Sequence, residues 1–272
     1  MADLILHHEV SGDGPAVVLI HEAIGDGRLW APQVEALAPR YRVVVPDLRG
    51  YGRSPLPPER FRHADDVVAV LDSLAIERTA LVGGSLGARV ALEVALTEPD
   101  RVWALALVAP GLSGFEWSEE VRAGWAAEEA ALDAGDIEVA VEINLRMWVD
   151  GPRRSPGDVD PAVRSRVAEM QRRALEIQVA AYADPERQPD EEPFDPPASA
   201  RLGEVRAPTL VVVGELDQPD IVAIAERAAA EIPGAGLVVL EGTAHAPSLE
   251  RPDQLSNLLS EFLDSQSDRV IA

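Results

Sequence analysis

Ser85 lies among glycines in the stretch Gly83-Gly84-Ser85-Leu86-Gly87, which fits the pattern G-x-S-x-G. A serine at the tip of a sharp turn exposes its hydroxyl, and glycines beside it let two backbones approach closely. The amide of Leu86 comes next and would be free to bind a developing oxyanion. The pattern predicts a nucleophilic serine, with a glycine-rich turn and an incidental serine as the alternative interpretation.

A serine hydroxyl is a poor nucleophile until a base removes its proton, so Ser85 requires a histidine on a nearby loop. The chain has five histidines, and only His245 follows the last predicted strand and precedes the last predicted helix. The base in turn needs a carboxylate that fixes its tautomer. Asp217 is the first candidate and Glu215 the second, because Asp217 lies further from the preceding strand and has more room to reach His245.

These residues must be positioned by apolar segments that alternate with amphipathic ones. We expect strands over residues 4–10, 16–20, 41–46, 79–82, 102–109, 209–213 and 237–240, and helices over 29–37, 61–74, 88–96, 221–232 and 252–262. This alternation predicts an α/β fold with a mostly parallel, doubly wound sheet. Active sites in such sheets lie at the carboxyl ends of the strands, where the Ser85 turn and the loop that begins with His21 both fall.

The alternation breaks between residues 111 and 200. We expect no strand there, but helices over 119–132, 137–148 and 163–183, with loops rich in proline and glycine between them. The acidic, proline-rich stretch 184–197 is interpreted as an ordered excursion or a flexible hinge. We therefore predict a core domain made of 1–110 and 201–272, with 111–200 inserted as a helical cap over the active end of the sheet.

Composition limits the partners of this chain. Its 272 residues carry a formal net charge of −23, and no lysine occurs, so all 24 basic residues are arginine. Such a surface repels phosphate backbones and anionic lipids, so we expect neither nucleic acid nor membrane as a partner. Cysteine is absent, which excludes disulfides and thiolate metal sites. The start has no signal-like segment, and we expect a soluble, cytoplasmic protein.

Together these motifs resemble the α/β-hydrolase fold family along nearly the whole chain. The resemblance implies an α/β-hydrolase fold, a mostly parallel doubly wound sheet with a helical cap insertion. It implies that Ser85 is the nucleophile, Asp217 the acid and His245 the base, in the family's chain order. The stretch from Asp47 to Ser54 resembles the family's D-x-R-G-x-G-x-S loop, which is a structural signature.

The family's H-G-x loop corresponds to His21-Glu22-Ala23. The resemblance implies that the amide of Ala23 joins that of Leu86 in the oxyanion hole, and that His21 and Glu22 lie against the substrate. Glu22 stands where the family usually has glycine. Its side chain either strains the loop, or brings a carboxylate to the oxyanion site and opposes negative charge there, or points outward.

The nucleophile position implies a reaction class. Aspartate there would indicate the family's dehalogenases and epoxide hydrolases, whereas Ser85 indicates acyl transfer to water through an acyl-enzyme. This chemistry needs no metal and no organic cofactor. Activity is expected to fall as His245 becomes protonated, near an unperturbed pKa of about 6.5.

The substrate must be chosen by the insertion, where Trp117, Trp125, Met147 and Trp148 supply apolar surface. We expect a small molecule with an apolar portion, contacted by Trp148. A small carboxylic ester or lactone is the first expectation, because it asks least beyond a Ser-His-Asp triad. The alternatives are a C–C bond hydrolase of ring-cleavage products, a lyase that uses His245 as its base, and a non-hydrolytic ligand-binding protein.

Overall fold

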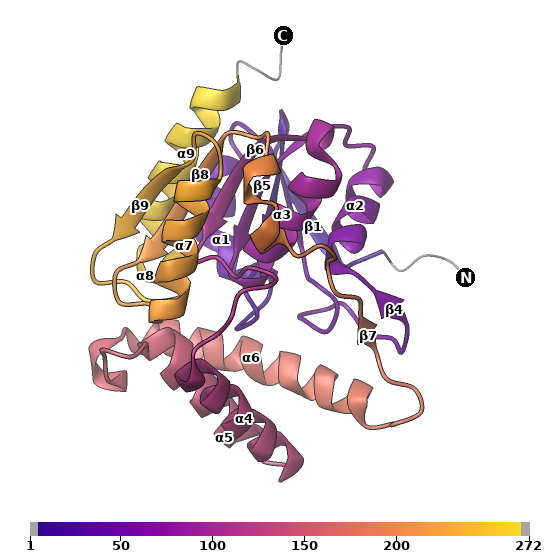
Figure 1. Cartoon of the computed structure of the whole chain (residues 1–272), viewed down its shortest axis with the longest axis vertical. Coiled ribbons are helices and arrows are strands. Elements are labelled where there is room, and N and C mark those ends of the chain that lie inside the picture. The colour runs from indigo at the N-terminus through magenta and orange to yellow at the C-terminus, as the bar shows by residue number, and fades with distance from the viewer. Residues whose placement is uncertain (1–4, 268–272) are drawn as a thin grey trace.

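The computed structural model describes residues 5–267, and its centre is a seven-stranded sheet (Figure 1). The strand order is β1-β3-β2-β5-β6-β8-β9. Only β1 runs antiparallel to its neighbour, β3, so the predicted mostly parallel sheet is confirmed. The strands are β1 His8–Ser11, β2 Ala16–Ile20, β3 Arg42–Pro46, β5 Thr79–Gly84, β6 Val102–Val108, β8 Thr209–Gly214 and β9 Gly236–Leu240.

Helices cover both faces of this sheet because its central strands are apolar on both sides. In β2, Val17 and Leu19 face one layer of the core, and Val18 and Ile20 face the other. The first layer is closed by α1 (Ala31–Leu37) and α9 (Pro252–Ser267). The second is closed by α2 (His63–Ser73), α3 (Leu86–Thr97) and α7 (Pro219–Glu231). The doubly wound arrangement is thus the consequence of strands that are buried on both faces.

The expected insertion, residues 111–200, follows β6, and its helices form a separate layer below the sheet in Figure 1. It contains α4 (Glu119–Asp133), α5 (Ile137–Asn144), a π-helical turn (Leu145–Asp150) and α6 (Pro161–Tyr182). α5 packs against both α4 and α6. Its apolar side chains continue into one of the two core layers, so the insertion is packed against the sheet layer rather than tethered beside it.

One expectation about this part of the chain was wrong, and one needs refinement. The insertion does contain a strand, β7 (Asp190–Glu191), which pairs in parallel with β4 (Arg60–Phe61) and ties the proline-rich stretch to the core. A two-residue strand has no periodicity that the sequence could reveal. The helix expected over 137–148 is present, but it changes to π-helical geometry at Leu145. The sequence does not reveal this change, because one extra residue in a helical turn leaves the amphipathic pattern almost unchanged.

Other boundaries differ by a few residues. The first strand begins at His8 rather than at residue 4, which lies outside the described residues. The helix expected to begin at residue 29 begins with a 3-10 turn at Gly27, and the last helix continues to Ser267. The remaining short elements are α8 (Pro247–Glu250) and 3-10 turns at Gly27–Trp30, Pro99–Arg101, Pro156–Asp158, Ala198–Ala200 and Leu202–Glu204.

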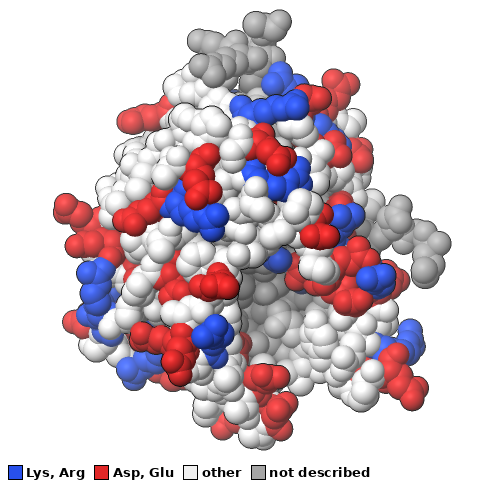
Figure 2. Space-filling model, viewed as in Figure 1, with Lys and Arg blue, Asp and Glu red and all other residues white. Residues whose placement is uncertain are grey.

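Figure 2 shows that carboxylate side chains are spread over both layers of the molecule, many of them beside an arginine. On this face the surface is hollowed where the sheet layer meets the insertion. None of the helices among the described residues has both the length and the apolar character needed to cross a membrane.

Candidate active site

Ser85 occupies a strained turn between β5 and α3. Its backbone angles are φ 48° and ψ −109°, a conformation that L-residues rarely adopt. The turn is possible because its neighbours lack side chains. A Cβ on Gly83 would lie 2.2 Å from the carbonyl oxygen of Gly87, and one on Gly87 would lie 2.2 Å from that of Ile20. The glycines of the motif therefore allow α3 to lie close to both β5 and β2, with Ser85 at the turn between β5 and α3.

Ser85, His245 and Asp217 form one hydrogen-bonded chain. The Oγ of Ser85 lies 2.8 Å from Nε2 of His245. The other ring nitrogen, Nδ1, lies 3.0 and 2.9 Å from the two carboxylate oxygens of Asp217. Both His245 and Asp217 are buried, whereas Ser85 is partly open. With Nδ1 protonated toward Asp217, Nε2 is free to accept the serine proton.

The loops after β8 and β9 bring Asp217 and His245, the expected acid and base, together. The backbone amide of Leu216 donates to the Thr243 carbonyl oxygen at 2.8 Å, which holds the two loops side by side. Glu215, the second candidate acid, does not face the base: its carboxylate accepts a hydrogen bond from the amide of Gly242 at 3.0 Å. Asp217, two residues further from β8 than Glu215, is thus the one that reaches His245. Glu215 instead stabilises the loop that carries His245.

The pKa of His245 responds to opposing effects. Burial alone would lower it, but the carboxylate of Asp217, with smaller contributions from Glu22 when it is ionised and from Glu250, outweighs burial and raises the pKa above the usual value of 6.5. The expectation of a midpoint near 6.5 is therefore corrected upward. Asp217 contributes most to the rise, through charge and through its hydrogen bond.

Two backbone amides beside Ser85 are available to a ligand. Ala23, in the loop after β2, and Leu86, the first residue of α3, both line the cavity that contains Ser85. Within residues 5–267, neither amide donates a hydrogen bond to a protein acceptor. An amide at the start of a helix carries a partial positive charge. The two amides are suitably free to bind an oxyanion next to the serine.

The placement of His21 corrects the expectation that it contacts substrate. Its side chain is fully buried and does not line the cavity. Nδ1 donates to the Glu22 carbonyl oxygen at 2.8 Å, and Nε2 accepts a hydrogen bond from the Leu48 amide at 2.9 Å. Burial lowers the pKa of His21, which fits a neutral ring that accepts through Nε2. His21 therefore joins the loop after β2 to the loop after β3.

Glu22 also lies away from the cavity, which corrects the second expected substrate contact. Its side chain is fully buried and packs against Gly84, where an added Cβ would lie 2.7 Å from the Glu22 Cγ. The side chain therefore does not point outward, and its backbone does not require the left-handed conformation that favours glycine. Neither carboxylate oxygen has a hydrogen-bond partner among the described residues. Burial raises the pKa of Glu22 to about 8.

A cavity of about 880 Å³ extends from Ser85 and His245 into the insertion. Its lining includes Trp117, Trp125 and Trp148, whereas Met147 does not line it. Trp117 contacts Trp125 edge to face with ring centroids 5.1 Å apart. The Trp148 ring lies 4.7 Å from the His245 ring, so it forms the wall nearest the base. Substrate contact by Trp148 remains a prediction.

Several polar residues that line this cavity were not predicted: Tyr51, Arg89, Glu128, Asn144, Gln171 and Gln178. Arg89 lies one helical turn after Ser85, so helical spacing alone could have placed it near the site. The others come from the insertion or from a loop, where spacing carries no such signal. Gln171 of α6, with its amide nitrogen toward the loop after β2, donates to the Ala23 carbonyl oxygen at 3.1 Å.

Within the described part of the chain, no group of three or more His, Cys, Asp or Glu side chains is arranged to hold a metal ion. The chemistry of the site as it stands is that of a hydroxyl, an imidazole and a carboxylate. The hydroxyl and the imidazole line a largely apolar cavity, the carboxylate is buried against the imidazole, and two free amides lie beside the hydroxyl.

Comparison with known proteins gives the family. The family model described as alpha/beta hydrolase fold matches residues 15–252. The chain is 31% identical to the pimeloyl-[acyl-carrier protein] methyl ester esterase of Aeromonas hydrophila, over 93% of this chain and 96% of that protein.

Two solved structures are similar over most of their length. A thermophilic esterase from Thermogutta terrifontis has a TM-score of 0.77 and 26% identity, covering 96% of this chain and 93% of that chain. Est816, described as an N-acyl homoserine lactone degrading enzyme, has a TM-score of 0.72 and 29% identity, covering 94% and 96%.

Proposed function

Because this chain belongs to the α/β-hydrolase fold family and is a hydrolase of ester or related bonds, we propose that it cleaves a small carboxylic ester or lactone. In this proposal Ser85 is the nucleophile, His245 the general base and Asp217 the acid that orients it. The observation that carries the proposal is the 2.8 Å hydrogen bond between the Ser85 Oγ and the His245 Nε2 at the end of the apolar cavity.

The reaction begins when His245 removes the Ser85 proton as Oγ attacks the substrate carbonyl carbon. Asp217 holds the ring with Nδ1 protonated and stabilises the imidazolium that forms. The amides of Ala23 and Leu86 donate to the carbonyl oxygen as it gains negative charge. His245 then gives the proton to the leaving alkoxide oxygen, and the acyl group remains on Ser85.

Water completes the cycle. His245 removes a proton from a water molecule, which attacks the acyl carbon; the second tetrahedral intermediate collapses and Ser85 recovers its proton from His245. With a lactone, the leaving oxygen remains attached to the acyl group, so one product, a hydroxy acid, is released. With an ester, an alcohol leaves first and a carboxylic acid second.

The cavity favours a substrate with an apolar or aromatic portion. Its wall carries Trp117, Trp125 and Trp148, whose ring faces and edges bury apolar groups well. An ester and a lactone are both kept in the proposal because the similar proteins include a methyl ester esterase and a lactone-degrading enzyme. A small molecule is the partner that this chemistry requires.

A fluorophosphonate probe tests the proposal directly. The wild-type protein is incubated with the probe, the adduct is located by peptide mass spectrometry, and aryl esters and γ-lactones of equal acyl length are assayed alongside. We expect an adduct on Ser85 and turnover of at least one substrate class. Ser85→Ala and His245→Ala should abolish both, whereas Ser113→Ala, a matched serine in the same cavity wall, should retain them.

A folded wild-type protein that the probe does not label would contradict the activated serine. Labelling of Ser85 without turnover of any ester or lactone would instead favour a C–C bond hydrolase or a ligand-binding protein. The relative turnover of matched esters and lactones then decides between the two substrate classes.

A further inference from the structure

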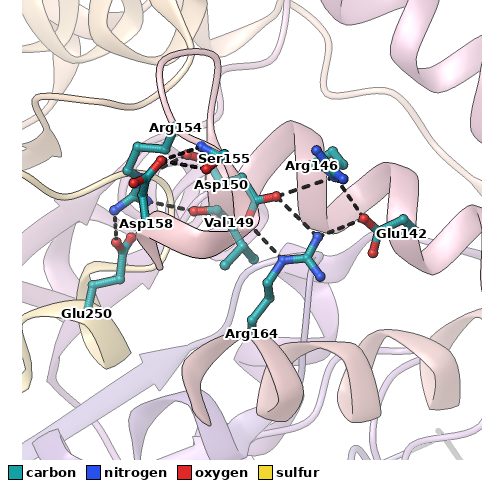
Figure 3. Close-up of polar contacts among 9 residues, drawn as sticks. All are labelled: Glu142, Arg146, Val149, Asp150, Arg154, Ser155, Asp158, Arg164 and Glu250. Carbon is teal, nitrogen blue, oxygen red and sulfur yellow. Dashed lines mark hydrogen bonds and ion pairs between the residues drawn. The ribbon is translucent and has the colours of Figure 1, made fainter. Parts of the chain in front are cut away.

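Arg154 joins the insertion to the core beside His245. Its side chain is almost buried, at 10% exposure, and lies just after the π-helical turn (Figure 3). Nη2 donates to the Val149 carbonyl oxygen at 2.7 Å and Nε to that of Asp150 at 2.9 Å. Nη1 donates to a carboxylate oxygen of Glu250 at 2.6 Å. One guanidinium therefore binds the end of the π-helical turn and a carboxylate of the core.

Glu250 carries this connection to the base. It is the last residue of α8, its side chain is only 5% exposed, and its second oxygen accepts a hydrogen bond from the amide of Ala244 at 3.0 Å. Ala244 precedes His245 in the chain. The contacts thus run without a gap from the insertion through Arg154 and Glu250 to the backbone that carries the imidazole.

A second connection reaches the same backbone from the same π-helical turn. The amide of His245 lies 3.4 Å from the Trp148 carbonyl oxygen, and the Trp148 ring lies against the imidazole. The acid loop is held likewise, because Nε2 of Gln218 donates to the Met147 carbonyl oxygen at 2.6 Å. The π-helical turn therefore contacts the loops of both the base and the acid.

The π-helical turn is itself fixed by a cluster of charges (Figure 3). Asp150, with 1% of its side chain exposed, accepts two hydrogen bonds from Arg164 of α6, at 2.9 and 3.1 Å. Arg164 also binds Glu142 of α5 at 2.9 Å. This cluster holds the turn to the neighbouring helices without touching Glu250, so it provides a matched control for Arg154.

We infer that Arg154 and Glu250 are positioning residues for His245. Through these two residues the insertion, packed against the core, holds the base in line with Ser85. The inference rests on the proposed function, in which His245 is the base. The ion pair of Arg154 and Glu250 has a geometric effect, since a displacement of about 1 Å in a reacting group strongly lowers the rate of the catalysed reaction. It also has an electrostatic effect, because the guanidinium balances a carboxylate beside the imidazole.

The titratable groups around His245 come from several elements, and one of them, Glu22, is neutral below its raised pKa of about 8. Asp217 faces His245 from the loop after β8, Glu22 from the loop after β2, and Glu250 from α8. Arg154 balances Glu250, and the guanidinium of Arg251 binds only carbonyl oxygens, those of Glu250 and Gly242. Removal of Arg154 leaves the Glu250 carboxylate unbalanced and raises the pKa of His245. Removal of the Glu250 charge lowers it.

Nuclear magnetic resonance titration of the His245 ring tests this electrostatic effect without requiring turnover. The samples are the wild-type protein, Arg154→Met, Glu250→Gln, their double variant and the control Arg164→Met. We expect the midpoint of His245 to rise in Arg154→Met, to fall in Glu250→Gln and to lie between them in the double variant. Arg164→Met should titrate like the wild type.

Kinetics tests the geometric effect on the best aryl ester. Arg154→Met should lower kcat about tenfold with little change in KM. Arg154→Lys keeps the charge but cannot form three separate hydrogen bonds in the same directions, so it should titrate like the wild type and recover part of kcat. Because the conservative variant retains the charge, it carries the test if Arg154→Met does not fold.

Three results would overturn the inference: midpoints that move in the same direction in Arg154→Met and Glu250→Gln, a midpoint unchanged in Arg154→Met, or equal losses of kcat in Arg154→Met and Arg164→Met. Failure of the proposed function looks different. In that case the wild-type protein would neither react with a fluorophosphonate nor hydrolyse an ester, whatever the titrations show.

Discussion

Two glutamates from different elements of the core lie near His245, and each is buried in a different way. Glu22, in the loop after β2, is fully buried with no hydrogen-bond partner among the described residues. Glu250, in α8, is nearly as buried but has an arginine and a backbone amide as partners. The charge of Glu22 is removed by a proton, since burial raises its pKa to about 8. The charge of Glu250 is instead balanced by Arg154, which belongs to the insertion.

This difference shows two ways in which a buried carboxyl group can affect the stability of the folded protein. A carboxyl group without a partner stays neutral up to the pH at which it must ionise, so its effect on stability depends on pH. A carboxylate with a counter-ion stays charged, and its effect depends on whether the partner is present. Near one imidazole the chain therefore combines a group that responds to pH with a group that responds to the position of the insertion.

The largest expected effect concerns the imidazole that both glutamates flank. Ser85→Ala and His245→Ala should each lower kcat by at least about 10³-fold, because nucleophile and base act as a unit. The measurement is steady-state hydrolysis of an aryl ester. Asp217→Asn should reduce activity through the wrong tautomer of the ring. Activity that survives in Ser85→Ala would show that Ser85 is not the nucleophile. The two glutamates beside His245 would then have no catalytic base to influence.

The next effect is the pH dependence that Glu22 adds to stability. Between its usual pKa of 4.5 and the raised value of about 8, the folded protein keeps a proton that the unfolded chain has lost. Raising the pH therefore favours unfolding, by about 1.4 kcal/mol per unit. Glu22→Gln has no proton to lose, so its advantage over wild type should grow from pH 5 to 8 and then level off.

Urea unfolding of both proteins at several pH values measures this difference. Glu250→Gln is the contrasting variant, because it breaks an ion pair and should destabilise the protein throughout the same range. A constant difference between Glu22→Gln and wild type across pH 5 to 8 would show that Glu22 is not buried as a neutral group.

On the insertion side, the buried pair of Asp150 and Arg164 should contribute to stability through its partner. Asp150→Asn leaves Arg164, 17% exposed, without its main counter-ion and should lower the free energy of unfolding by about 2 kcal/mol. The control is Glu138→Gln, whose pair with Arg172 lies at the surface and should contribute nothing measurable. Equal values for the two variants would contradict the burial argument.

The smallest effects distinguish the two ends of the aromatic wall. Trp148 is 7% exposed and lies against His245, whereas Trp125, in α4, lines the cavity and is 37% exposed. Trp148→Ala should lower kcat about tenfold, because the His245 ring loses the side chain that packs against it. Trp125→Ala should raise KM about threefold with kcat unchanged. Steady-state kinetics with one apolar ester decides this. The reverse pattern would assign binding to Trp148 and positioning to Trp125.

Much of the fold could be predicted because its signals are local. The run Ala16–Ile20 is apolar throughout, which is what a strand covered on both faces requires, and the glycines around Ser85 announce a turn that only small residues allow. The pair of β4 and β7 could not be predicted, since two residues have no period and their partners are 130 positions apart, as for Arg60 and Asp190.

The candidate site was predicted where chain order and loop position constrain it, as for Ser85, Asp217 and His245. The sequence left three alternatives for the Glu22 side chain, because sequence shows which residue follows a strand but not on which side its side chain packs. A space beside Gly84 admits that side chain, and this space is made by residues far away in the sequence. The role inferred for Arg154 depends likewise on a contact across 96 positions.

The strands on either side of the insertion, β6 and β8, are neighbours in the sheet. The chain therefore leaves and re-enters the core at adjacent points, and an insertion of any length could be exchanged here during evolution without altering strand order. The exchange has a condition. A different insertion would join the core at the same two strands but would lack Trp148, Arg154 and Gln171. New substrate preferences acquired in this way must therefore be accompanied by new contacts to the loops of the core.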